Sequence, residues 1–593
     1  MSAPRAIPTR AILVTLLFCL AFLTPGAPAD QLAHAASPPS AIAADPRYYD
    51  IGNPVLTDLW VDPVQGSDNN DGSTRAKALR TVTSAWERIP TRRQLGPTGY
   101  RICLVAGTYP EESVPTYWES CYGTYDFPVI LEAVDGPGSA LLPGMNVADC
   151  RYLYLIGLRL ESPFGDAVHY ERCDHVLIRR CTLLGTRPDD AQETVKINQS
   201  QYVYLEDSDI SGAWGNAVDF VAVQYGHVQG CRIHNAGDWC IYVKGGSAYL
   251  RVEGNEIFDG GTGGFSAGQG SGFEFLVSPW LHYEASHIQF INNVVHDVEG
   301  AGMGVNGGYN VLLAYNTLYR VGARSHAIEV VFGWRGCDGD TARCQANLSA
   351  GGWGSTANEP REPIPDRNVF IYNNVLYNPA GYRSEWTHFA IYGPQPPSAG
   401  TNIPSPARCD TNLRIRGNLI WNGPADMELG VEAEDQGCQP GNPTCTADQL
   451  RADNAINSLE PQLVNPGRGD FRPVPDGNVF RATAHAIPPF PGGDRPQRPL
   501  APEGDLTNRV LLDRAGAVRT AAGPPGAYTG RTAASPSATP TRRPPTPTAI
   551  PSPTAPVAQP TATTRQGATA TAPPATPFLS RRLFLPVIIK RWD

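Results

Sequence analysis

Hydrophobic and polar residues alternate along the middle of the chain, and the alternation returns at intervals. Val176 and Ile178 alternate with Leu177 and Arg179, and the same pattern returns at Val203. The apolar positions continue at Leu205, Val252, Ile288, Phe290, Val311, Leu313 and Ile415. Alternation with a period of two is typical of a strand with one buried face. The pattern therefore predicts a series of short strands that share one apolar core.

A small or amide residue follows each predicted strand, at the bend into the next short strand. These residues are Cys181, Ser208, Cys231, Asn255, Asn293, Asn316, Asn374 and Asn418. The shorter intervals between them are 23, 24 or 27 residues, and the longer intervals fit the same unit carrying an insertion. A period of this size, filled with short strands, predicts stacked coils, in a solenoid of about ten coils.

The asparagines of this series have two interpretations. Stacked asparagine side chains can hydrogen-bond from coil to coil as a ladder, which satisfies amides that would be costly to bury. Alternatively, asparagine simply marks the turns. Because the register holds across five asparagines, we expect the ladder.

The region before the repeats carries an ordered set of short motifs. They are Leu59-Trp60-Val61-Asp62-Pro63, then residues 66–73, 79–82, 85–86 and 105–109. Their order resembles the N-terminal start of secreted right-handed parallel β-helix proteins of the pectin-lyase-like superfamily, although residues 100–103 replace the usual lead into the last motif. Segments at 461–464, 470–473 and 523–528 resemble the end of the same domain.

This resemblance covers about residues 58–530. It implies an all-β fold, namely a right-handed parallel β-helix with a short N-terminal capping helix. It does not specify an activity, because this fold carries lyases, hydrolases, epimerases and non-enzymatic adhesins.

The two ends of the chain differ in composition from its middle. Residues 1–35 combine a basic start, an apolar stretch and small residues at the cleavage position, which predicts a secretory signal and an extracellular protein. Residues 531–577 are rich in Pro, Thr and Ala and are predicted to form a disordered spacer. Residues 578–593 form a short hydrophobic tail, interpreted either as a signal for attachment to the cell envelope or as a docked terminal strand.

Twelve cysteines follow the predicted signal, and an even number in an exported protein favours disulfides. The expected pairs are Cys337 with Cys344, Cys438 with Cys445 and Cys103 with Cys121. Cys150 and Cys173 occupy equivalent positions one coil apart, either as a further disulfide or as stacked free thiols. The cysteine spacing does not resemble a zinc site.

The net charge of the chain limits the kinds of partner that it can bind. The formal net charge is −10, and lysine occurs only at positions 77, 196, 244 and 590. This balance argues against nucleic acid as a partner. We expect a monomer that binds a polysaccharide.

A second strand recurs in each coil, just before the first, and its outward positions are predicted to form one column. The members are His169, Lys196, Asp219, Ile241, Glu274, Gly304 and Glu329. Insertions at about 260–271, 276–287, 333–367 and 393–411 flank this column. Loops that wall a polar strip form a groove, and functional residues concentrate in such loops. The resemblance places the substrate cleft over the same strand.

Lys196 is the candidate catalytic base, between His169 and Asp219. Eliminative cleavage of a uronic acid polymer needs a base for the C5 proton and a cation or metal that neutralises the carboxylate. The alternative is a solvated lysine on a charged face. As an outward residue, Lys196 is expected to contribute little to stability, so that Lys196→Ala should leave the unfolding midpoint nearly unchanged.

Two other functions compete with a lyase. Glu274 and Glu329 are predicted to lie two coils apart, which suits the carboxylate pair of a glycoside hydrolase, although both can be ordinary surface acids. The third class is a non-catalytic carbohydrate-binding or adhesin module at the cell surface.

Further residues are candidates for binding substrate or metal. Lys244, His326, Arg335 and Trp334 are the candidate substrate-binding residues, with anchoring of loops as the alternative for His326 and Arg335. The turns that enter the strip carry Asp166, Asp189, Asp190 and Asp238. These acids either hold Ca²⁺, the one candidate cofactor, or are ordinary turn residues. The tryptophans of the groove-side loops suit stacking on sugar rings or loop packing, and they are Trp214, Trp239, Trp280, Trp334, Trp353 and Trp386.

Overall fold

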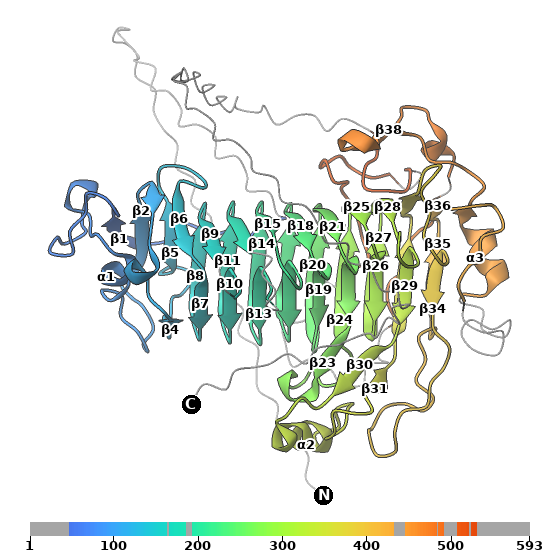
Figure 1. Ribbon diagram of the computed structural model, residues 1–593, viewed down its shortest axis with the longest axis horizontal. Helices are drawn as coiled ribbons and strands as arrows, with labels where there is room; N and C mark the ends of the chain where they lie inside the picture. Colours follow the sequence, from blue (N-terminus) through green and yellow to red (C-terminus); the bar gives the residue numbers. More distant parts are fainter. Residues whose placement is uncertain are drawn as a thin grey trace, which may run out of the picture. The chain divides into compact units, whose positions relative to one another are not determined.

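Parallel strands dominate the computed structural model, which describes residues 47–162, 165–185, 192–431, 445–482, 484–491, 507–520 and 523–530. The strands form three large sheets, here called sheets A, B and C, that stack coil upon coil (Figure 1). The predicted signal, the Pro/Thr spacer and the hydrophobic tail lie outside the described residues. Within the described ranges, no helix is long and apolar enough to cross a membrane.

Sheet A contains β1 (Leu56–Val61), β2 (Gly99–Leu104), β5 (Val129–Ala133), β8 (Arg151–Ile156), β11 (Asp174–Arg179), β14 (Gln201–Glu206), β17 (Gln224–Gln229), β20 (Ser247–Glu253), β24 (Ala285–Ile291), β27 (Gly308–Ala314), β32 (Arg367–Tyr372) and β35 (Arg414–Arg416). Sheet B contains β3 (Gly107–Thr108), β6 (Ala140–Pro143), β9 (Arg159–Ser162), β12 (Thr182–Gly185), β15 (Asp209–Ser211), β18 (Arg232–Ala236), β21 (Glu256–Gly260), β25 (Val294–Val298), β28 (Thr317–Val321), β33 (Val375–Tyr377), β36 (Leu419–Trp421) and β37 (Ala455–Ile456). Sheet C contains β4 (Trp118–Glu119), β7 (Met145–Ala148), β10 (Val168–Glu171), β13 (Val195–Asn198), β16 (Val218–Val221), β19 (Trp239–Lys244), β22 (Gly263–Gly268), β26 (Ala301–Asn306), β29 (Ile328–Val331) and β34 (Phe389–Ile391).

Smaller elements decorate the coils. They are β23 (Gly270–Gly272), β30 (Gly333–Gly336), β31 (Glu362–Ile364), β38 (Leu463–Asn465), β39 (Asp470–Pro473), α1 (Val82–Trp86), α2 (Thr341–Ser349), α3 (Ala447–Asp453) and the 3₁₀ helices η1 (Arg75–Lys77), η2 (Glu111–Ser113), η3 (Phe273–Phe275), η4 (Pro466–Arg468) and η5 (Asn478–Arg481). Figure 1 shows β23, β30, β31 and α2 projecting together from one side of the stacked strands.

Each coil runs through sheet A, then sheet B, then sheet C, and returns to sheet A one layer further along. Strand β11, for example, pairs in parallel with β8 on one side and β14 on the other. The predicted strands, the parallel stacking and the all-β class are therefore confirmed. The solenoid strands end at Ile456, and the described residues beyond it pack on the outside of the coils.

The apolar column predicted from alternation forms the interior. Val176, Val203, Val252 and Ile288 belong to one buried cluster that follows the coils from end to end. The predicted capping helix is α1, whose buried Val82, Ala85 and Trp86 cover the first coil. Trp86 packs edge-on against Trp118. Burial of this column is the main source of the fold's stability.

The asparagine ladder is confirmed. The Nδ2 of Asn255 donates to Oδ1 of Asn293 at 3.0 Å, and Asn293 donates in the same way to Asn316 at 3.2 Å. The series continues through Asn374, Asn418 and Asn454. Each Oδ1 also accepts a backbone N–H of the preceding coil, as in Asn316 Oδ1 with the Asn293 amide at 2.9 Å. The ladder therefore satisfies both the side chains and the bends.

The outward face of sheet A is covered by the ends of the described chain. Tyr49 stacks on Tyr204 with ring centroids 4.3 Å apart, and it lies in one apolar cluster with Leu177. At the other end, Phe490 packs on Phe370, and Asn292 Nδ2 donates to the carbonyl of Leu512 at 2.8 Å. Leu177 and Phe370 on the outward face of sheet A are therefore buried beneath terminal segments, whereas Arg251 between them stays 37% exposed.

The expectations for the cysteines are only partly confirmed. Cys337 and Cys344 form a disulfide. Cys445 is disulfide-bonded, and its expected partner Cys438 lies outside the described residues. The prediction of a Cys103–Cys121 bond is wrong, because both are buried free thiols. Cys150 and Cys173 are also free, in agreement with the stacked-thiol interpretation, and Cys121, Cys150 and Cys173 pack in the core as small apolar groups.

Candidate functional site

One outward column of sheet C carries the charged residues that the sequence places together, and it is called the strip below. In register, it consists of Asn146, His169, Lys196, Asp219, Tyr242, Ser266, Gly304, Glu329 and Ala390. The prediction that positions 169, 196 and 219 line one face is confirmed.

Two members of the predicted column are wrong. Ile241 points inward and is fully buried, so that Tyr242 takes its outward place. Glu274 lies in η3, outside sheet C, and Ser266 occupies the outward position of that coil. Glu274 and Glu329 therefore do not form the carboxylate pair predicted for hydrolysis.

Lys196 is held among carboxylates. Its Nζ lies 3.7 Å from Oδ2 of Asp219, with side chains 19% and 2% exposed. Burial disfavours the charged ammonium, but the negative charges of Asp219, Glu193 and Asp166 outweigh it and raise the pKa of Lys196. Lys196 is therefore a cation over the whole physiological range, which suits a charge-neutralising role better than the role of a base.

His169 sits beside Lys196 with both ring nitrogens in defined contacts. Its Nδ1 lies 3.2 Å from Oδ2 of Asp166, and its Nε2 lies 3.2 Å from Nδ2 of Asn198. The carboxylate accepts the Nδ1 proton and the Asn198 amide donates to Nε2, so that the lone pair is on Nε2. The side chain is 30% exposed. A carboxylate that orients an imidazole in this way is the arrangement of a general base.

Glu193 is a further acid of this cluster, on the turn before β13. Its side-chain oxygens accept hydrogen bonds from the backbone and side-chain amides of Asn216. Burial, reinforced by the negative charge of Asp219, raises the pKa of Glu193 to about 8. The pKa of Asp166 is lowered instead, because the hydrogen bond from His169 and the charge of Lys196 outweigh its burial. Adjacent carboxyl groups thus hold different protonation states near neutral pH.

Two buried oxygens of the site lack hydrogen-bond partners within the described part of the chain, namely Oδ1 of Asp219 and Oδ1 of Asn198. Buried acceptors are usually paired, so unpaired ones mark a place where water or a substrate hydroxyl donates.

Lys244 and Tyr242 extend the site by two coils. Lys244 Nζ donates to the Tyr242 hydroxyl at 2.7 Å and lies 4.2 Å from the centre of its ring. Lys244 ends β19, in the outward column next to the strip. Burial raises the pKa of Asp238, which lies on the turn before β19.

His326 and Glu329 form a second polar pair further along the strip. The two are joined by a 2.8 Å contact between Nε2 and Oε2, and Asn306 Nδ2 donates to Oε1 of Glu329 at 3.2 Å. The ring of Trp386, which is 52% exposed, lies over His326 with centroids 5.9 Å apart. This pair therefore combines hydrogen-bonding groups with an open aromatic face.

Arg335 cannot bind substrate, which corrects the expectation from the sequence. Its side chain is 0% exposed and pairs with Glu284 at 2.6 Å. It also donates to the carbonyls of His282 and Trp353 at 2.8 and 2.6 Å. Arg335 anchors the loop that carries His282 and Glu284, as the alternative interpretation proposed. Trp334 is partly buried and packs against the core.

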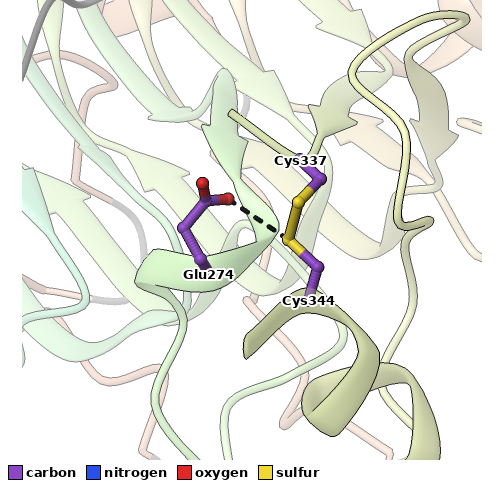
Figure 2. Close-up of side chains that lie close together, drawn as sticks. All are labelled: Glu274, Cys337 and Cys344. Carbon is purple, nitrogen blue, oxygen red and sulfur yellow. Dashed lines mark hydrogen bonds between the residues drawn. A yellow bond between two sulfur atoms is a disulfide. The ribbon is translucent and has the colours of Figure 1, made fainter. Parts of the chain in front are cut away.

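Glu274 also has a structural position, which Figure 2 shows beside the Cys337–Cys344 disulfide. Its carboxylate accepts from the backbone amides of Asp338 and Asp340 at 3.1 and 3.2 Å. Asp340 in turn caps α2. Glu274 thus fastens the start of α2 to η3, and burial keeps it from substrate.

The described residues do not fit a Ca²⁺ site at the strip. Asp166 already binds His169 and the Glu193 amide, and Asp219 binds Lys196. Among the described residues, the only group of three potential ligands is Glu274 with Cys337 and Cys344, and its sulfurs are bonded to each other. Asp189 and Asp190, two of the four predicted ligands, lie outside the described residues.

Sequence reasoning missed Glu193, Asn198 and Asn216 as parts of the site. A usable signal existed for two of them. Asn198 lies two residues after Lys196 in the same strand, and side chains two apart share a face. Glu193 starts the turn into this strand, as Asp166 does one coil earlier. The contact between Asn216 and Glu193 could not be predicted from the spacing of residues in the sequence.

Comparison with known proteins gives a class of fold. Residues 143–278 match the family model of the right-handed β-helix region. Together with the three parallel sheets, this match confirms the right-handed parallel β-helix that the sequence predicts. A comparison with curated proteins finds no match.

Several solved structures are similar. Pectate lyase Pel9A shares 15% identity over 55% of this chain and 77% of its own, with a TM-score of 0.31. A rhamnogalacturonan lyase shares 12% identity over 61% of this chain and 87% of its own, with a TM-score of 0.37. The A-module of the mannuronan C-5 epimerase AlgE4 of Azotobacter vinelandii shares 14% identity over 49% of this chain and 82% of its own, with a TM-score of 0.33.

Proposed function

We propose that this protein is a polysaccharide lyase that acts on uronic acid polymers, with its catalytic centre at His169 and Lys196. The observation that carries the proposal is the neighbourhood of an oriented imidazole and a fixed ammonium. His169 and Lys196 are register partners on adjacent strands, and Asp166 and Asp219 hold them. Strand spacing of about 4.8 Å brings both within reach of one sugar ring.

The roles follow from the contacts of the two side chains and from the raised pKa of Lys196. His169 Nε2 takes the C5 proton of the uronate when the substrate displaces the hydrogen bond from the Asn198 amide, and the ammonium of Lys196 stabilises the negative charge that develops on the carboxylate group. The electron pair forms the C4–C5 double bond and the C4–O bond breaks. The leaving oxygen takes a proton from solvent. These roles replace the initial assignment of Lys196 as the base, because its raised pKa keeps it protonated.

Incubation with pectate, alginate and glycosaminoglycans tests the reaction. A lyase product is unsaturated and raises the ultraviolet absorbance, and we expect this signal to disappear in His169→Ala. Polymer binding without absorbance or new reducing ends would contradict catalysis and favour the non-catalytic surface module.

Hydrolysis is the second candidate, because Glu193 carries a proton up to a pH of about 8 while Asp166 is ionised. This is the division of roles between the acid and the carboxylate of glycoside hydrolases. New reducing ends without absorbance, lost in Glu193→Gln, would support it.

We also propose that the protein is exported as a monomer and retained at the cell envelope through its tail. The basic and apolar start of residues 1–35 and the hydrophobic residues 583–589 support this location. Cell fractionation of the full chain and of a chain ending at residue 577 tests it. Equal release of both into the medium would contradict retention by the tail.

A further inference from the structure

Trp386, His326, Glu329 and Asn306 form a compact outward cluster at a distance from His169 and Lys196, and it is called the distal cluster below. Trp386 and His326 come from turns between sheets B and C, while Glu329 and Asn306 come from β29 and β26. Ser266 Oγ donates to Oδ1 of Asn306 at 2.8 Å, which fixes the amide so that it faces Glu329. The side chains of the cluster are thus held in place before any ligand arrives.

The distal cluster has the composition of a sugar-binding site. Trp386 has no buried role that explains it, since 52% of its surface is exposed on a turn. An open aromatic face stacks on the apolar face of a sugar ring. The imidazole of His326 and the carboxylate of Glu329 beside it are the kinds of groups that hydrogen-bond sugar hydroxyls.

The distal cluster lies on the same strip as the catalytic centre. From Lys196 to Glu329 the register passes through Asp219, Tyr242, Ser266 and Gly304. These are five strand steps, or roughly 24 Å at about 4.8 Å per step. Ser266 and Gly304 are small and buried, so neither of them rises between the two sites. A polymer chain longer than this distance can therefore reach both.

A second exposed tryptophan lies beside the catalytic centre, on the turn before β16. Trp214 is 40% exposed and precedes Gly215, where an added Cβ would lie 2.8 Å from the Glu193 carboxylate. Among the described residues, Trp214 and Trp386 are the only tryptophans of the exposed large hydrophobic set. Both stand on turns between sheets B and C, at the same edge of the strip.

The charge of the distal cluster indicates which kind of sugar unit it can bind. Glu329 is an acid, and the imidazole of His326 at most balances it. The nearest basic residue in sequence, Arg324, pairs with Glu299 at 2.6 Å. Nothing in the cluster carries the net positive charge that a uronate carboxylate requires, whereas Lys196 supplies it at the catalytic centre.

We propose that the distal cluster is a second sugar-binding subsite that takes an uncharged, hydroxyl-rich unit of the same polymer chain. This inference rests on the proposed function. It narrows the substrate to long polymers in which uronates are interspersed with neutral sugars.

Affinity electrophoresis of the full chain tests the subsite. The long probes are hyaluronan and a rhamnogalacturonan, in which uronate and uncharged units alternate, and alginate, in which every unit is a uronate. Their disaccharides, used as competitors, are too short to span both sites. Trp386→Ala is expected to weaken binding of the alternating polymers by roughly three- to tenfold, the value of one aromatic contact. Its competition by disaccharides at the catalytic centre should stay unchanged.

Phe480→Ala is the matched control, since Phe480 is an exposed aromatic residue in η5, on the sheet B side. Glu329→Gln keeps the size of the side chain but removes its charge, and should shift the preference toward alginate. Equal binding of alternating polymers by the wild type and Trp386→Ala, or a wild-type preference for alginate, would overturn the subsite while the lyase proposal stands. Failure of the wild type to bind any of the polymers would overturn both.

Discussion

The outward faces of sheets A and C begin from the same strand geometry and end in opposite environments. On sheet A, Leu177 points away from the core yet is 0% exposed, because Tyr49 and its neighbours cover it. On sheet C, His169 points away from the core in the same coil and stays 30% exposed. The difference shows that one outward face of a solenoid can be covered while another stays exposed. This chain covers much of one face with its own ends and leaves the other accessible at His169.

The largest expected effect belongs to the open face. His169→Ala should lower the rate of polymer cleavage by about 10²–10⁴-fold, the usual contribution of a general base. The unfolding midpoint should stay nearly unchanged, since the side chain is partly solvated. Product absorbance and thermal unfolding measure the two effects. An inactive variant with a large loss of stability would show that His169 is structural.

The covered face should respond in the opposite way. Leu177→Ala removes a fully buried side chain and is expected to lower the free energy of unfolding by about 2–5 kcal/mol. Cleavage by the folded protein should be unaffected. Denaturant titration measures the loss, and a change below about 0.5 kcal/mol would mean that the terminal segment does not cover this face.

Lys196 combines the two cases, because its side chain lies on the outward face of sheet C and is nevertheless largely buried. The expectation that Lys196→Ala spares stability needs correction, since the variant leaves the buried Asp219 carboxylate without its partner. We expect a loss of activity together with a loss of stability. The double variant Lys196→Ala/Asp219→Asn should recover most of the stability and none of the activity. Recovery of activity in the double variant would contradict a role for the ammonium.

A pH dependence set by Glu193 is also expected. Its pKa is about 8 in the folded protein, above the ordinary value of 4.5. A raised folded pKa of an acid means that the folded state binds the proton more tightly. The contribution to stability is therefore full below pH 4.5 and is lost as the pH rises through 8. Cleavage should fall over the same upper range, because the newly ionised Glu193 repels the uronate carboxylate. Glu193→Gln should remove both slopes.

The sequence predicts the parts of this fold that repeat. The core positions and the ladder follow from alternation and from asparagines in register, and both are local patterns. The predicted column was wrong at Ile241 because β19 is buried along almost its whole length. Its apolar residues therefore do not show which side chains point inward and which point outward. The predicted column was also wrong at Glu274, because the small residues of β22 do not resemble a strand in the sequence.

The protonation states could not be predicted at all. They depend on Asp166, Glu193 and Asp219 approaching Lys196 from three coils, and no spacing in one dimension gives their burial. The same reason explains Arg335, whose partner Glu284 lies 51 residues away in sequence.

The asparagine ladder also limits how this chain can lengthen during evolution. Every rung donates one amide hydrogen forward, from Asn255 toward Asn454, and the other back to a carbonyl of the preceding coil, as Asn255 does to Val228. A turn can lengthen freely without touching a rung, as the 58-residue interval between Asn316 and Asn374 shows. A ladder position, in contrast, is gained or lost only with its whole coil, although serine or cysteine can replace the asparagine, as at Ser208 and Cys231. Duplication of coils is therefore a permitted step in the history of such a protein, and the loss of half a coil is not.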